Sequence, residues 1–153
     1  MKTKNFHLLV QLFFVLGLLL IIPGFLPAQT AAELEAVLDD PAISYSQAAR
    51  FVMAASGGSA DEAFESAAAR RWLPRGASAD DPIRLGALSH LLMKAFGLKG
   101  GMMYAIFPGP RYAYRSMVSR SFIQGSSDPA MIVSGERFLL ILGNVLDAAG
   151  GEE

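Results

Sequence analysis

The chain has 153 residues, enough for one domain, and 52% of them are hydrophobic. It contains no cysteine, which excludes disulfides, thiolate metal sites and a lipoprotein signal. With 13 Lys plus Arg against 14 Asp plus Glu, it lacks the basic excess that is typical of nucleic-acid-binding proteins.

The first 29 residues are typical of a secretory signal peptide. Lys2 and Lys4 precede an almost uninterrupted apolar run over residues 8–22, and a helix breaker and small residues follow. The run is shorter than the roughly 20 residues that cross a bilayer, so we expect cleavage within residues 28–31. A retained anchor is the alternative. The pattern predicts an exported protein of the periplasm or cell surface, whose mature chain keeps 11 basic residues against 14 acidic ones.

Helical periodicity and end signals predict six helices after the signal. We expect them over residues 31–38, 45–56, 59–72, 85–96, 111–122 and 135–147. Residues 102–107 are too short to assign from periodicity, and residues 149–153 are expected to fray. No segment alternates with period two, so the sequence predicts an all-α fold, as one domain over residues 30–148.

Local patterns add detail to this prediction. Ser44 with Gln47, and Ser59 with Glu62, have the spacing of a capping box ahead of the second and third helices. The last helix is apolar nearly all round at residues 138–142, which predicts that it is the most buried of the six.

An Asp-Pro loop followed by an apolar helix occurs three times. The repeated positions are Asp40, Pro41 and Ile43, then Asp81, Pro82 and Ile83, then Asp128, Pro129 and Ile132, with Trp72 and Phe122 ahead of the second and third loops. One helix pair cannot bury its apolar faces alone, so we expect three pairs around a shared centre. The Asp side chains are expected to accept backbone N–H bonds in the turns, with ligand binding as the alternative.

This triple helix-loop-helix pattern, over about residues 31–147, resembles the S-layer homology domain family. The resemblance implies a pseudo-threefold bundle of six helices. It also implies grooves between the motifs that hold an anionic cell-wall polysaccharide through a motif arginine, and a role in anchoring proteins to the envelope. This chain departs from the motif at the arginine column, which reads Tyr45, Leu85 and Ser134. Arg84 lies one place earlier, and only Glu136 keeps the motif acid.

Residues 104–115 are the least repetitive stretch, with three Tyr and two Arg around a Pro-Gly-Pro turn. Arg111 and Arg115 are four residues apart and share a helix face. Together with Arg84 they are our candidates for binding anionic groups, and Tyr112 is the candidate for stacking. The alternative is that the arginines pair with loop acids while the tyrosine rings fill the edge of the core.

No catalytic pattern is visible. His90, the one histidine of the mature chain, has no partner for a metal site or for general-base chemistry, and we expect it at the surface or at a helix cap. No phosphate loop, zinc motif or nucleophile elbow occurs.

We therefore expect a non-enzymatic interaction or anchoring module of the cell envelope, with no cofactor and no metal site. Its expected partner is a cell-wall polysaccharide or an envelope protein, not a nucleic acid, and it would touch a membrane only through an uncleaved N-terminal segment. The alternative is a small self-assembling or complex-forming periplasmic or outer-membrane-associated protein, with residues 102–107 as its interface.

Overall fold

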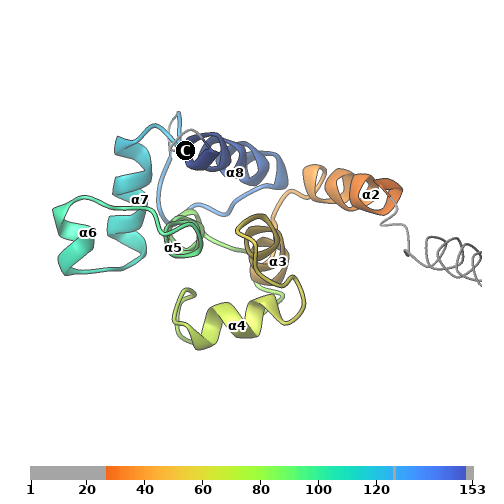
Figure 1. The fold of residues 1–153 in the computed structure, drawn as a ribbon, viewed down its shortest axis with the longest axis horizontal. Helices are drawn as coiled ribbons and strands as arrows, with labels where there is room; N and C mark the ends of the chain where they lie inside the picture. The colour runs from red at the N-terminus through yellow and green to blue at the C-terminus, as the bar shows by residue number, and fades with distance from the viewer. Residues whose placement is uncertain (1–26, 126, 151–153) are drawn as a thin grey trace, which may run out of the picture. The chain divides into compact units, whose positions relative to one another are not determined.

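The computed structural model describes residues 27–125 and 127–150. These residues contain seven helices and no strand, which confirms the all-α prediction (Figure 1). The helices are α2 (Pro27–Leu38), α3 (Tyr45–Ala55), α4 (Ala63–Ala69), α5 (Leu85–Ala95), α6 (Met102–Ile106), α7 (Pro110–Ser119) and α8 (Gly135–Gly150). The expected signal peptide lies outside the described residues, except for residues 27–29 at the start of α2. The chain from Glu35 onward forms one compact unit, which contains α3 to α8.

The helix boundaries follow the local end signals in most places. The capping box of Ser44 and Gln47 is confirmed, because the Ser44 Oγ accepts from the Gln47 N–H at 3.2 Å and the Gln47 side chain accepts from the Ser44 N–H at 2.7 Å. The prediction of a capping box at Ser59 is wrong. Glu62 adopts a left-handed conformation with φ of 53°, no side chain caps α4, and the helix begins only at Ala63. Residues 102–106, which periodicity could not assign, form the additional helix α6.

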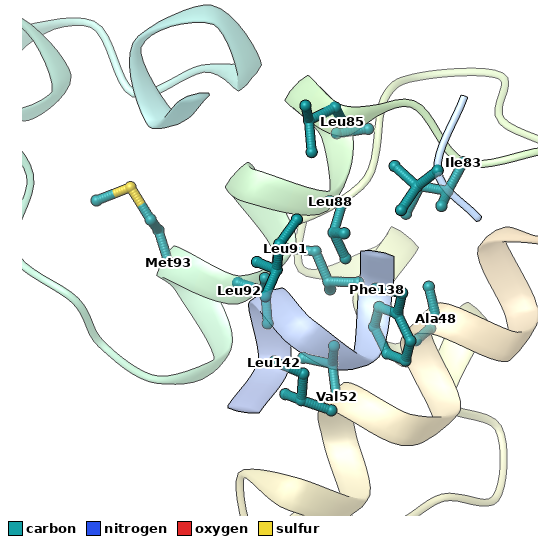
Figure 2. Close-up of a cluster of buried hydrophobic side chains, with 14 of the residues drawn as sticks. Ala48, Val52, Ile83, Leu85, Leu88, Leu91, Leu92, Met93, Phe138 and Leu142 are labelled. Atoms are coloured by element: carbon teal, nitrogen blue, oxygen red, sulfur yellow. The ribbon is translucent and has the colours of Figure 1, made fainter. Parts of the chain in front are cut away.

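The core is centred on α5, in which every residue from Leu85 to Met93 is buried. The prediction that the last helix is the most buried is wrong, because Leu140 in α8 is 61% exposed. Figure 2 shows Leu88 and Leu91 of α5 beside Phe138 of α8. The ring of Phe138 also meets the ring of Phe51 edge-on, with centroids 6.1 Å apart. None of the described helices is both long and apolar enough to span a bilayer.

Three loops meet in a closed ring of backbone hydrogen bonds. The N–H of Ile43 donates to the carbonyl of Val133 at 3.0 Å, that of Val133 to Ile83 at 3.1 Å, and that of Ile83 to Ile43 at 2.9 Å. All three side chains are fully buried, whereas Ile132 is 49% exposed. Val133 therefore takes the place that the repeat pattern assigned to Ile132, because the third loop reaches the ring one residue later.

The helices that follow these loops begin on a second cyclic set of bonds. The first N–H of each helix donates to a carbonyl in the next loop: Tyr45 to Asp81 at 3.0 Å, Leu85 to Met131 at 2.8 Å, and Gly135 to Asp40 at 2.8 Å. The first N–H groups of a helix have no partner within it. Each loop therefore supplies the partner that its neighbour's helix lacks, which ties the three segments together.

The segments ahead of the second and third loops share one local structure. Arg71 and Ser121 both adopt left-handed conformations, with φ of 60° and 62°. The next residue then returns an N–H bond to the preceding helix, Trp72 to Ala67 at 2.9 Å and Phe122 to Met117 at 3.0 Å. An arginine covers each ring, Arg70 over Trp72 at 5.0 Å and Arg120 over Phe122 at 5.2 Å. Trp72 and Phe122 therefore occupy matching positions at the ends of α4 and α7.

Candidate functional site

The three candidate arginines line one hollow, of about 600 Å³, which we call the arginine groove. Arg84 is the residue immediately before α5, and Arg111 and Arg115 stand one turn apart on α7. The other lining residues are Tyr45, Pro74, Gly86, Ala87, Pro110, Tyr114, Pro129 and Ala130. Arginines that are far apart in sequence thus converge because α5 and α7 pack against each other.

The floor of the groove depends on a close approach at Gly86, in the first turn of α5. A Cβ at this position would lie 3.2 Å from the carbonyl oxygen of Pro129 and 3.6 Å from the Cβ of Pro110. The Gly86 N–H also donates to that Pro129 carbonyl at 2.8 Å. The absence of a side chain here lets the third loop and the start of α7 reach α5, which brings Arg84 and Arg111 to the same hollow.

The groove contains three guanidinium groups and no carboxylate among its lining residues. The Arg84 Nη1 donates to the carbonyl of Ala130 at 3.0 Å, which holds this side chain against the third loop. Within the described part of the chain, Arg111 and Arg115 have no hydrogen bond or ion pair, and both are exposed. Among the described residues, these two arginines therefore do not pair with loop acids, which was the alternative expectation.

Two tyrosines line the groove, but Tyr112 is not one of them. The Tyr112 ring lies against Phe107 instead, with centroids 6.5 Å apart. The Tyr114 hydroxyl donates to the Ser127 carbonyl at 2.8 Å. Burial raises the pKa of Tyr45, the nearby Arg84 charge opposes this rise and Asp81 adds to it, so the hydroxyl stays protonated. Tyr114 could have been found from its spacing three residues after Arg111, whereas Tyr45 comes from a distant helix.

Two further hollows adjoin the groove. One, of about 380 Å³, shares Tyr45, Pro74 and Arg84 with it and adds Arg75 and Asp81. The other, of about 440 Å³, shares Pro74 and Pro110 with the groove and is lined by Arg71, Arg75 and His90. Asp81 is the one acidic residue among the described linings of these three hollows, so positive charge dominates this side of the molecule.

His90 is buried, which corrects the expectation of a surface or capping residue. Its Nδ1 lies 3.4 Å from the Tyr104 hydroxyl. Burial lowers the pKa of His90, the Lys94 charge lowers it further, and a hydrogen bond with the Arg71 main chain opposes these effects. Among the described residues, no group of three or more His, Asp or Glu is arranged to hold a metal ion.

The Asp-Pro loops use two of their carboxylates within the turns. The Asp40 Oδ1 accepts the Ala42 N–H at 2.9 Å, and the Asp128 Oδ1 accepts the Ala130 N–H at 2.6 Å. Asp40 also accepts from the Gln47 side chain at 3.1 Å. These bonds hold each loop in shape as it enters the ring of backbone bonds. Asp81 makes no such side-chain bond among the described residues and instead lines a hollow.

No protein-family model, no curated protein and no solved structure matches this chain. The groove itself combines planar guanidinium donors, aromatic rings and a protonated hydroxyl. Guanidinium groups bind carboxylates and phosphates through paired hydrogen bonds, and aromatic rings stack on the apolar faces of flat or cyclic ligands.

Proposed function

We propose that this chain is an exported, non-catalytic module that binds an anionic cell-wall polysaccharide in the arginine groove and thereby acts in anchoring at the cell envelope. The observation that carries the proposal is the convergence of Arg84, Arg111 and Arg115 on one hollow without a carboxylate. Guanidinium groups that have no carboxylate beside them, next to aromatic rings, suit sugar rings that bear carboxylate or phosphate groups.

The proposal includes the architecture that the sequence resembles, a pseudo-threefold S-layer-homology-like bundle. Its support is the cyclic hydrogen bonding of Ile43, Ile83 and Val133, together with the second cyclic set at the helix starts. In this arrangement α6 is an insertion ahead of the third helix pair. The arginine groove then lies between the second and third repeats, since Arg84 belongs to one and Arg111 and Arg115 belong to the other.

The arginines of the groove do not stand in the family's motif column. With Val133 in the ring, that column reads Tyr45, Leu85 and Gly135. Arg84 is displaced by one residue, and Arg111 and Arg115 come from the preceding helix of the third pair. The proposed site therefore replaces one motif arginine with a cluster from two elements, and its ligand contacts have to be tested on these residues directly.

Sedimentation of the full chain with purified cell-wall sacculi tests the function. We expect wild-type protein to co-sediment, and the Arg111→Gln, Arg115→Gln double variant to bind at least about tenfold more weakly, since each charge-assisted hydrogen bond contributes about 1.5–3 kcal/mol. Arg70→Gln, on the Trp72 ring and away from the groove, is the matched control and should bind like wild type.

Removing the anionic polymers from the sacculi separates the ligand classes. We expect retention to disappear with these polymers. Undiminished binding to the stripped sacculi would point to a protein or to uncharged glycan and would contradict the proposal, as would a double variant that binds as tightly as wild type.

A further inference from the structure

The helix α6 and the residue after it expose an unusual set of apolar side chains. Met102, Met103, Ile106 and Phe107 are all exposed, Met102 to 78%. We call these four residues the α6 patch. Tyr104, between them, turns inward and is buried with its ring against that of His90, at a centroid distance of 6.0 Å. The inward Tyr104 holds the helix in place, so the outward orientation of the patch is part of the fold.

The chain around the patch carries positive charge only. Residues 82–127 contain no Asp or Glu, and all the acidic residues lie outside this range. The basic residues within it are Arg84, Lys94, Lys99, Arg111, Arg115 and Arg120. The segment that bears α5, α6 and α7 is therefore strongly basic within a chain whose net charge is −1.

Several of these bases lie close to α6. The Lys94 ammonium is 5.9 Å from the centre of the Tyr104 ring. Arg120 donates to the Lys99 carbonyl at 3.1 Å, which places its guanidinium at the loop that enters α6. Arg111 follows the loop that leaves α6, and Figure 1 shows α6 beside α7. The apolar patch is thus flanked by cations where the chain enters and where it leaves.

We propose that the α6 patch docks on the surface of a lipid bilayer that carries anionic headgroups. The four apolar side chains enter the interfacial region, while Lys94, Lys99 and Arg120 contact the headgroup phosphates. Apolar insertion combined with basic residues is the pair of signals that gives stable peripheral binding. The Phe107 ring lies against the Tyr112 ring. Tyr is enriched at the membrane–water interface, and Phe is typical of the apolar face that interfacial helices bury.

The charge pattern favours a bilayer over a second copy of the chain. A symmetric dimer through α6 would bring two basic segments together, with no acid in residues 82–127 of either copy to offset them. An anionic membrane surface attracts the same cations. The sequence had placed membrane contact only in the N-terminal segment, and the patch is a separate site that does not rest on polysaccharide binding by the groove.

A tryptophan placed in the patch of the full chain tests the proposal, with the native Trp72 replaced by Phe in every variant so that the introduced indole is the one emitter. Since the apolar run at residues 8–22 can itself adsorb to vesicles, the readout is the local emission of Met102→Trp rather than sedimentation. We expect a blue shift, and quenching by brominated acyl chains, on vesicles of phosphatidylcholine with phosphatidylglycerol, and weak effects on phosphatidylcholine alone. About 0.5 M salt should reduce the response severalfold. Leu140→Trp, exposed on α8 near Glu136, is the matched control and should not respond.

Two changes in the Met102→Trp background sharpen the test. Ile106→Ser with Phe107→Ser should weaken the response at least tenfold, and Lys99→Glu should remove the preference for phosphatidylglycerol. Emission that ignores anionic vesicles while circular dichroism shows a folded protein would overturn the proposal. So would a dimer, detected by light scattering without lipid, that the Ile106 and Phe107 changes abolish, because the patch would then belong to a second copy.

Discussion

The Cα of Gly135, at the start of α8, lies against the main-chain carbonyl of Val37 in α2, so closely that a Cβ on Gly135 would overlap that oxygen. The Gly135 N–H also donates to the Asp40 carbonyl at 2.8 Å. A glycine that looks unremarkable in the sequence is thus the point where the third helix start closes the cyclic set of backbone bonds.

Gly135→Ala should therefore destabilise the protein. The contact is with backbone, which cannot move aside like a flexible side chain, so we expect the free energy of unfolding to fall by about 3 kcal/mol. Gly143→Ala in the same helix is the control, because nothing lies within 4 Å of its added Cβ. That change should stabilise α8 by up to about 1 kcal/mol. Urea denaturation followed by circular dichroism measures both, and equal stability of the two variants would contradict the packing at Gly135.

Variants of Val133 and Ile132 test which of these two residues the third loop places in the ring of backbone hydrogen bonds. Val133→Ala removes buried methyl groups from the ring and should lower the free energy of unfolding by about 2 kcal/mol. Ile132→Ala truncates a half-exposed side chain and should change it by less than about 0.5 kcal/mol. The reverse order of effects in thermal denaturation would restore Ile132 to the position equivalent to Ile43 and Ile83.

The first and second Asp-Pro loops should respond differently to loss of their carboxylates. Asp40→Ala removes acceptors for the Ala42 N–H and the Gln47 side chain, and should lower the free energy of unfolding by about 2 kcal/mol. Asp81→Ala removes no such bond among the described residues and should stay within about 0.5 kcal/mol of wild type. Chemical denaturation gives both values, and an Asp81 variant as unstable as the Asp40 variant would assign the Asp81 side chain a role in its loop.

His90 should make the stability of the protein sensitive to acid. Burial and the Lys94 charge lower its pKa in the folded state from the ordinary value of 6.5, so the unfolded chain takes up a proton more readily. The stability that His90 contributes while it is uncharged is fully present above pH 6.5. It is lost as the pH falls through the lowered pKa that His90 has in the folded state. We expect His90→Gln to lose less stability than wild type over this acid range, as measured by denaturation at several pH values. Parallel curves for the two proteins would show that His90 is not the group responsible.

Much of the local structure could be predicted because it depends on neighbouring residues. Periodicity and caps located α3, α5, α7 and α8 within a few residues, and Ser44 was recognised from its spacing to Gln47. The length of α4 was overestimated, because its expected cap depended on Glu62 taking an ordinary conformation instead of a left-handed one. Arg111 and Arg115 could be paired because four residues make one helical turn.

The sequence by itself determined the all-α class, the repeated Asp-Pro loops and the charge separation that leaves residues 82–127 without an acid. Only the tertiary structure decided that Val133 closes the ring, that Tyr45 rather than Tyr112 joins the arginines, and that α6 keeps its apolar side chains outside the core. The physical reason is distance along the chain. Helix periods and caps act within a few residues, whereas the ring, the groove and the exposed patch depend on which distant segments pack together.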